Sequence, residues 1–256
     1  MNDRRSNAIL ARRSSRRVPL GALCCLAAAC LAAVAAPLEA AESWGGSFDA
    51  TSDYLVRGIS RSDNGAAIQA DVHLATDGGF VGGLFASSVQ FEPGDTRSAE
   101  SSAFVGYAWQ ASPAWRAKLL ASYYGYIGRD SGAQYNYGEL TLETAYDDWL
   151  DIDLVYSPDS PRYVAGRGLS GVAADSAEVT LRTPWRRCFA ATAGVGYSRY
   201  AGPGGGGYAY WSAGGVVDLA PWTLSLSYVN TGAEAAALFY SAAAHDRWIA
   251  AVIWRF

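Results

Sequence analysis

The sequence has little lysine and histidine and, beyond its first 40 residues, almost no cysteine. Lys118 is the only lysine among the 256 residues, and His73 and His245 are the only histidines. Three of the four cysteines precede residue 41, which leaves Cys188 alone in the remainder. One cysteine cannot form an internal disulfide, and neither histidine has a second histidine at the spacing of a metal site. The sequence therefore predicts no disulfide, no metal site and no cofactor.

Residues 1–40 have the features of an export signal. A leader with six arginines precedes an apolar, alanine-rich run over residues 20–38, and small residues follow it. This order is typical of a cleaved signal peptide. We expect cleavage after Ala40 or Ala41 and a β-barrel domain over residues 41–256. An uncleaved membrane helix, a twin-arginine signal and a lipid-anchored cysteine are the alternatives.

The chain is acidic once this signal is removed. The full sequence has 20 basic and 24 acidic residues, of which six arginines and two acids lie in residues 1–40. The remainder holds 14 basic and 22 acidic side chains, a net charge of −8. This charge argues against nucleic acid as a partner. The remainder also lacks an apolar run of about 18 residues, so it contains no spanning helix.

The last ten residues of the sequence alternate with the period of a β-strand, which is two. One row is wholly apolar and is aromatic at both ends: Trp248, Ala250, Val252, Trp254 and Phe256. Such a row is typical of a strand that crosses a bilayer between two aromatic girdles. An open strand edge in lipid would leave backbone groups unpaired, so we expect this strand to pair with the first one. The alternative is the edge strand of a soluble sandwich.

The same alternation recurs along the chain and predicts twelve strands. The expected ranges are 46–57, 66–76, 80–90, 101–109, 115–126, 137–146, 149–157, 174–183, 188–200, 208–219, 222–230 and 247–256. Connections of five residues or fewer alternate with connections of about eight residues or more. Loops sorted in this way are typical of outer-membrane barrels, whose short turns face the periplasm. We therefore predict an all-β fold: a transmembrane, antiparallel, up-and-down β-barrel.

The first part of this barrel resembles a known family. Residues 49–60 read DATSDYLVRGIS, SDN and AIQ follow, and residues 79–89 read GFVGGLFASSV. These strings are similar to the N-terminal signature of the TorF-type putative porins, a proteobacterial family of conserved exported proteins. The chain departs from that signature at Arg61, Ala66, Phe85 and Ser88. The resemblance implies an outer-membrane barrel more firmly than transport. Similarity of the last strand to those of other outer-membrane proteins implies that Phe256 is an assembly signal.

Polar and charged side chains occupy the rows opposite the apolar ones. Charges facing lipid are costly, so these rows are expected to face the barrel interior. The candidate lumen-lining residues are Asp49, Asp53, Arg57, Gln69, Asp71, His73, Arg116, Lys118, Glu139, Glu143, Asp151, Asp153, Glu178 and Arg182. Bases and acids on neighbouring strands indicate cross-strand ion pairs, and four neighbouring acids indicate an acidic wall. Arg57 is expected to pair with lumen acids in an architectural role.

These features indicate a narrow channel for passive diffusion of small solutes, with cations or neutral solutes favoured over anions. Twelve strands lie between barrels of about eight strands, which side chains fill, and of about sixteen, which hold water. A non-conducting structural or adhesive barrel is therefore the second interpretation. The protein is not expected to be an enzyme. The third interpretation is nevertheless a barrel hydrolase that uses His73 with Asp71, or His245 with Asp246 and Ser241. The expected partners are outer-membrane lipid, the barrel assembly machinery and small solutes, and the expected location is the outer membrane.

Overall fold

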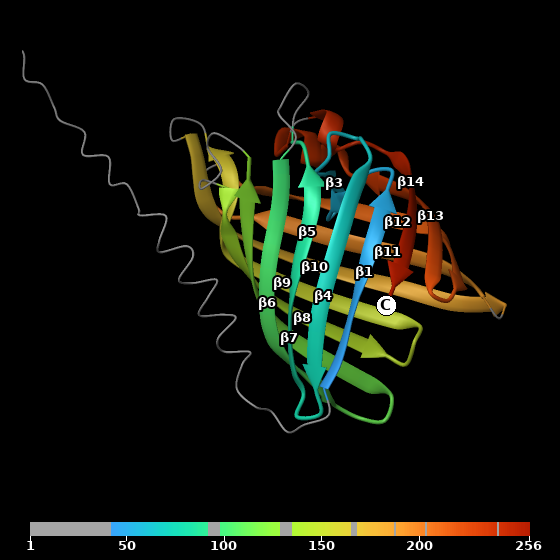
Figure 1. Ribbon diagram of the computed structural model, residues 1–256. Coiled ribbons are helices and arrows are strands. Elements are labelled where there is room, and N and C mark those ends of the chain that lie inside the picture. The colour runs from blue at the N-terminus through green and yellow to red at the C-terminus, as the bar shows by residue number, and fades with distance from the viewer. Residues whose placement is uncertain are drawn as a thin grey trace, which may run out of the picture. The chain divides into compact units, whose positions relative to one another are not determined.

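The chain folds into one closed antiparallel barrel (Figure 1). The computed structural model describes residues 42–91, 98–128, 135–164, 168–186, 188–202, 204–239 and 241–256. Among these residues, twelve strands form the barrel wall, and each lies beside its neighbours in sequence. The predicted up-and-down barrel is confirmed. The predicted signal peptide lies outside the described residues. Within the described part, no helix has the length and apolar character needed to cross a bilayer.

Each of the twelve expected strands is present, with small shifts at most ends. The wall consists of β1 (Glu42–Thr51), β4 (Ala67–Thr76), β5 (Phe80–Val89), β6 (Ser98–Gln110), β7 (Trp115–Ile127), β8 (Tyr137–Tyr146), β9 (Leu150–Val164), β10 (Gly168–Arg186), β11 (Phe189–Tyr200), β12 (Gly206–Leu219), β13 (Trp222–Thr231) and β14 (Arg247–Arg255). Two further strands, β2 (Leu55–Val56) and β3 (Ile59–Ser60), form a separate hairpin. Two 3-10 helices, η2 (Ala233–Ala237) and η3 (Ser241–Ala243), connect β13 to β14.

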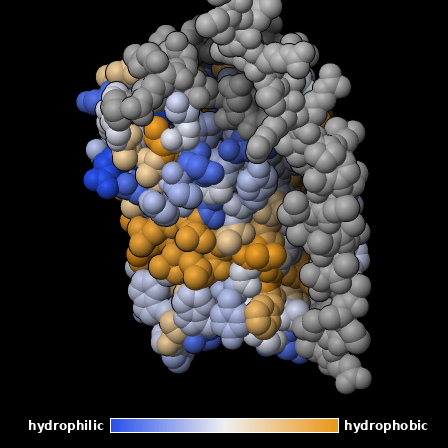
Figure 2. Space-filling model, turned by 90° about the vertical axis from the view of Figure 1, so that its left-hand side faces the viewer, coloured by the Kyte–Doolittle hydropathy of each residue, from blue (hydrophilic) through white to orange (hydrophobic). Residues whose placement is uncertain are grey.

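Side chains alternate between the outside and the inside of the wall. On β4, Ile68 and Val72 are exposed on the outer surface, whereas the side chain of Asp71 bonds to that of Ser47 on the neighbouring strand. On β5, whose two rows are both apolar in sequence, Phe80 and Leu84 are the exposed ones. Figure 2 shows an apolar band across the visible face, with more polar surface above and below it. Water does not favour so large an apolar surface, whereas lipid does.

The barrel closes where β1 pairs antiparallel with β14, with Phe48 opposite Trp254. The backbone N–H and C=O of Gly46 both bond to Phe256, each at 3.1 Å. The Phe256 ring contacts the rings of Trp44, Phe48 and Trp254. Each of the twelve wall strands thus has two hydrogen-bonded neighbours. The predicted pairing of the first and last strands is confirmed.

Two predicted boundaries are wrong. The first strand ends at Thr51 and not at Arg57, because the chain turns into the barrel interior after it. The long loop expected over residues 158–173 is mostly strand, since β9 and β10 extend as a hairpin to a connection at 165–167. A register shift between Val172 and Ala174 lets this ladder continue past segments that contain proline and glycine. The expected alternation of long and short connections therefore fails at this hairpin.

Deletion of Phe256 is expected to lower the yield of folded barrel. The deletion removes two backbone hydrogen bonds at the closing seam and one ring of the aromatic cluster. The measurement is the fraction of protein that shows heat-modifiable migration after expression. Phe80→Ala, which removes another exposed ring next to a short turn, is the control. Equal folded fractions for the two variants and the parent chain would refute the predicted assembly role.

Candidate functional site in the barrel interior

Residues 52–65 leave the wall after β1 and fold into the barrel; we call them the inner hairpin. β2 pairs with β3, and the two turn residues, Arg57 and Gly58, have φ angles of 53° and 78°. Two positive φ angles match the type I′ turn of a two-residue hairpin, which favours glycine. A side chain at Gly58 would also collide with Tyr210, since its Cβ would lie 3.0 Å from the Cβ of that tyrosine. Ile59 and Ser60 of the hairpin are buried.

One anchor of the inner hairpin is an ion pair with β8. Nη2 of Arg57 lies 2.8 and 2.9 Å from the two carboxylate oxygens of Glu139. The Arg57 side chain is 16% exposed and that of Glu139 is 4% exposed. Burial alone would lower the pKa of Arg57, but the Glu139 carboxylate outweighs it and raises the pKa above its ordinary value. The structure thus brings two predicted lumen residues together as a charged, buried pair.

The second anchor is an ion pair with the start of β14. Nη1 of Arg247 lies 2.5 Å from Oδ2 of Asp53, and both side chains are buried. The hydroxyls of Ser60 and Ser62 donate to Oδ1 of Asp53 at 2.6 and 2.7 Å. Asp53 therefore accepts hydrogen bonds from two serines of the hairpin as well as from Arg247. These bonds fix the shape of the hairpin as well as its position. The prediction placed Asp53 on the wall, whereas it lies inside the barrel on the hairpin.

The turn of the inner hairpin rests against β12 and β13. The hydroxyl of Tyr208 donates to the Arg57 carbonyl at 3.0 Å, and the hydroxyl of Thr231 donates to the Gly58 carbonyl at 2.8 Å. Ile59 packs in an apolar core with residues of η2, of η3 and the segment just after it, and of β10, β11 and β12. This core occupies the side of the lumen between the hairpin and β12–β14.

A buried acid that the sequence analysis missed holds the hairpin on its other flank. Glu100 on β6 is 1% exposed and accepts hydrogen bonds from the hydroxyls of Tyr54 and Tyr126, at 2.8 and 2.6 Å. The expected fourth strand began at Ser101, one residue too late to include Glu100. When the expected strand is extended by one residue, its alternation places Glu100 on the inner row, and this alternation is the signal that identifies it.

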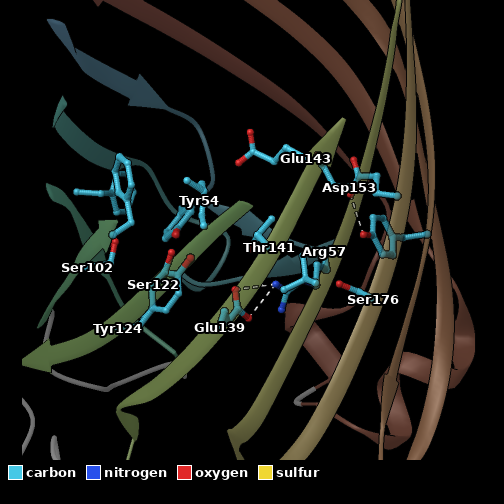
Figure 3. A pocket seen from close by; sticks show the side chains of 16 residues that line it. Tyr54, Arg57, Ser102, Ser122, Tyr124, Glu139, Thr141, Glu143, Asp153 and Ser176 are labelled. Atoms are coloured by element: carbon cyan, nitrogen blue, oxygen red, sulfur yellow. Dashed lines mark hydrogen bonds and ion pairs between the residues drawn. The ribbon is translucent and has the colours of Figure 1, made fainter. Parts of the chain in front are cut away.

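A cavity of about 400 Å³ remains on the side of the hairpin that faces β5 to β10 (Figure 3). This volume falls in the range of about 300–1,000 Å³ that small-ligand sites occupy. Tyr54 and Arg57 of the hairpin form part of its lining, and Tyr210 of β12 completes it. Figure 3 shows the Arg57–Glu139 pair at the cavity, with Glu143 and Asp153 on the strands beside it. The lining therefore combines apolar side chains with hydroxyl and charged groups.

Three acids form one row across the cavity wall. Glu143 on β8 lies opposite Asp153 on β9, which lies opposite Glu178 on β10. Nζ of Lys118 lies 2.6 Å from Glu143, and the Tyr210 hydroxyl donates to Glu178 at 2.7 Å. Asp153 has no hydrogen-bond or ion-pair partner in the described part of the chain. Three carboxylates against one ammonium give this row an excess of negative charge, which attracts cations. We call Glu143, Asp153 and Glu178 the acidic row.

The remaining predicted residues lie away from the cavity. Gln69 donates to the Ser87 hydroxyl at 3.2 Å, and Asp49 has a buried carboxylate oxygen without a partner. Asp151 lies opposite Ala145 and Thr180 on the neighbouring strands.

Two predicted bases lie near the short turns. Arg116 contacts the exposed Asp148 at 3.0 Å, and Arg182 is paired with Asp218. Of the ion pairs expected between strands β7 and β8, the structure places Lys118 with Glu143 and gives Arg116 a turn residue as its partner.

Asp71 and His73 do not form a hydrolase arrangement. The Ser47 hydroxyl donates to one oxygen of Asp71 at 2.7 Å, and Nδ1 of His73 lies 2.7 Å from the other. The carboxylate thus lies between the serine and the histidine, whereas a serine hydrolase needs the imidazole between them.

His245 and Asp246 likewise point to different partners. Nδ1 of His245 lies 2.6 Å from a backbone carbonyl of its own loop, whereas Asp246 accepts bonds from Tyr228 and Asn230 at 3.0 and 2.7 Å. The side chain of Ser241 lies outside the described part. Across the described residues, no three His, Cys, Asp or Glu side chains gather closely enough to hold a metal ion.

Residues 40–255 match the model of a family described as "Bacterial protein of unknown function (Gcw_chp)". The chain belongs to the Gcw_chp family. That description assigns no activity, and it does not carry the TorF name, which stays a prediction. Curated proteins give no significant match to this Gcw_chp sequence.

Solved structures of porins share the fold of this Gcw_chp protein. The KdgM porin is 12% identical, with a TM-score of 0.51, over 83% of this chain and 99% of its own. The NanC porin is 7% identical, with a TM-score of 0.52, over 83% and 98%. A KdgM porin in complex with disordered oligogalacturonate is 10% identical, with a TM-score of 0.50, over 84% and 99%. At these identities, the similarity concerns the fold alone.

Glu139→Ala is expected to destabilise the barrel by about 3–5 kcal/mol, because it leaves the buried Arg57 charge without its partner. The measurement is the urea midpoint of unfolding in micelles. Asp175→Ala is the matched control, since it removes the partner of Arg199 in an ion pair whose two side chains are exposed. Exposed pairs contribute little, so the control is expected to keep the parental midpoint. An equal shift in both variants would contradict a special role for the Arg57–Glu139 pair.

Proposed function

We propose that this Gcw_chp protein is an outer-membrane channel through which small solutes diffuse passively. The observation that carries the proposal is a cavity with charged groups in its lining, enclosed by a closed barrel whose outer surface bears an apolar band. An apolar exterior suits lipid, and a polar interior suits water and solutes. The porin fold supports the same function. Export by a signal peptide over residues 1–40 and insertion by the barrel assembly machinery belong to this proposal.

The channel is narrow, because the inner hairpin occupies part of the lumen. Twelve-stranded barrels enclose less space than the sixteen-stranded ones that hold wide aqueous channels. The apolar core beside β12–β14 reduces that space further and leaves the cavity along β5–β10 as the route. Passage is therefore limited to small solutes.

The charge of the cavity favours cations and neutral solutes over anions. The acidic row faces a lining whose one arginine, Arg57, is already paired with Glu139. Rings of one sign of charge select ions of the other sign. Galacturonate units carry carboxylates, so the ligand in the KdgM complex is poorly suited to this cavity, and we do not assign it here.

A second candidate is a non-conducting barrel that binds a partner through its loops. The inner hairpin favours it, since it runs across the lumen between two walls. This candidate and the channel differ in whether ions pass through the folded protein.

Purified full-length protein in a planar bilayer is expected to give discrete conductance steps in KCl. The reason is the polar cavity within the barrel, which offers ions a hydrated path. Heat-unfolded protein in the same detergent is the control and is expected to give no steps. Silence of the folded protein at every voltage would refute the channel and favour the non-conducting barrel.

The double variant Asp153→Asn with Glu178→Gln is expected to lose cation preference. It removes the two acids of the row that Lys118 does not pair, and so brings the row close to neutrality. The measurement is the zero-current potential across a KCl gradient, which should move toward zero. Asp148→Asn, at an exposed turn, is the control and should keep the parental potential. Unchanged cation preference in the double variant would show that the acidic row does not select ions.

A further inference from the structure

We infer that the Arg57–Glu139 ion pair sets the size limit for solutes, because it holds the inner hairpin across the lumen. This inference rests on the proposed channel function. Arg57 and Glu139 thus have a specificity-determining role. Their contact with each other limits passage, and their individual charges do not. Three features of the structure support it: the path of the hairpin, the unequal packing on its two sides, and the position of the pair at the cavity.

The inner hairpin bridges opposite walls of the barrel. Asp53 is tied to β14 and Arg57 is tied to β8. In the order of the closed barrel, six steps separate these two strands in either direction around the ring of twelve described strands. Two strands so placed face each other across the lumen. The hairpin therefore divides the lumen rather than lining one side of it.

The two sides of the hairpin are packed differently. Toward β12–β14, Ile59, Tyr208 and Ala235 belong to one buried apolar cluster. Toward β5–β10, Tyr54 bonds to Glu100 of β6 and packs against a second aromatic cluster, and the rest of this side faces the 400 Å³ cavity. Solutes can therefore pass on the cavity side alone, and the distance between the hairpin and that wall limits their size.

The Arg57–Glu139 pair lies at this limiting side. Both residues line the cavity, and the pair is the contact that joins the hairpin turn to β8. The other contacts of the turn, from Tyr208 and Thr231, hold it to the opposite side. Without the pair, the turn keeps its attachment to β12–β13 and loses the one to β8. The turn can then move away from β8 and widen the cavity there, while Tyr54 stays bonded to Glu100 of β6.

The pair is strong enough to hold this position. Nη2 of Arg57 lies within hydrogen-bond distance of both carboxylate oxygens of Glu139, and both side chains are largely removed from water, so the charged contact is stronger than it would be in solvent. Arg57 and Gly58 form the tight turn with positive φ angles, and the Arg57 side chain reaches Glu139 on β8 from it. The hairpin thus acts as a fixed constriction and not as a mobile plug.

A charge exchange tests the inference. Arg57→Glu and Glu139→Arg each place two like charges together, and the double variant restores a pair of opposite charges. Each single variant is expected to raise single-channel conductance by about twofold or more, since conductance grows with the width of the constriction. Each should also admit larger neutral sugars in liposome swelling, whereas the double variant should return toward the parental values. Asp175→Arg, which breaks the exposed pair with Arg199 in the same way, is the matched control and should keep parental conductance.

The outcomes separate the inference from the function on which it rests. Heat-modifiable migration first selects variants that fold, and Glu139→Gln, which keeps the side-chain shape, replaces any single variant that does not. If parent and single variants conduct equally and admit the same sugars, the inference is overturned and the channel stands. If the double variant behaves like the single ones, the ion pair is not the determinant, and the inference is again overturned. If neither the parent nor any folded variant conducts, the channel function itself is refuted, and if the parent conducts but the folded single variants do not, the inference alone is overturned.

Discussion

Closure of the wall is the constraint on which the rest of the structure depends. Backbone groups in lipid must be hydrogen-bonded within the protein, so the first and last strands have to pair. Their pairing fixes the register, and the register fixes which residues point inward, because a shift of one residue would exchange the two faces of a strand. With Phe48 opposite Trp254 on the outside, Asp49 and Asp71 are directed inside. The pairing of β1 with β14 thus determines which of their side chains face the lumen.

The seam also explains how the chain can enter the lumen. β1 ends at Thr51, but Ser52 still bonds to Ala250 of β14, through its N–H at 2.8 Å and its hydroxyl at 3.0 Å. Beyond this point Arg247 of β14 turns to Asp53 of the inner hairpin. The edge that β1 leaves is therefore covered by a side-chain hydroxyl and an ion pair. A single departure from the wall gives the barrel its internal constriction without opening the sheet.

The wall could be predicted from the sequence because the lipid side imposes one rule along every strand, and a rule of period two is visible locally. The inner hairpin could not. Tyr54 and Val56 continue the alternation of β1, so the local pattern extends the strand to Arg57, whereas Tyr54 finds its partner in Glu100, 46 residues away. Long-range pairing decides the path of the hairpin, and no short pattern reports it. Glu100 was missed for a different reason, because the expected strand began one residue after it. Of the segment that resembles the TorF-type signature, residues 52–64 lie in this hairpin, and the remainder lies mostly on the wall strands β1, β4 and β5.

The hairpin also determines the electrostatics of the lumen. The hairpin brings one cation, Arg57, to the cavity. Because Arg57 is paired with Glu139, its charge does not neutralise the acidic row on β8–β10. Among the described wall residues, Lys118, the single lysine of the sequence, is the cation paired with this row. On its opposite side the hairpin faces an apolar core, which contributes no charge to the lumen. A solute in the cavity therefore meets negative charge on one wall and a neutral ion pair on the hairpin. In the proposed channel, size and charge are therefore selected by different residues.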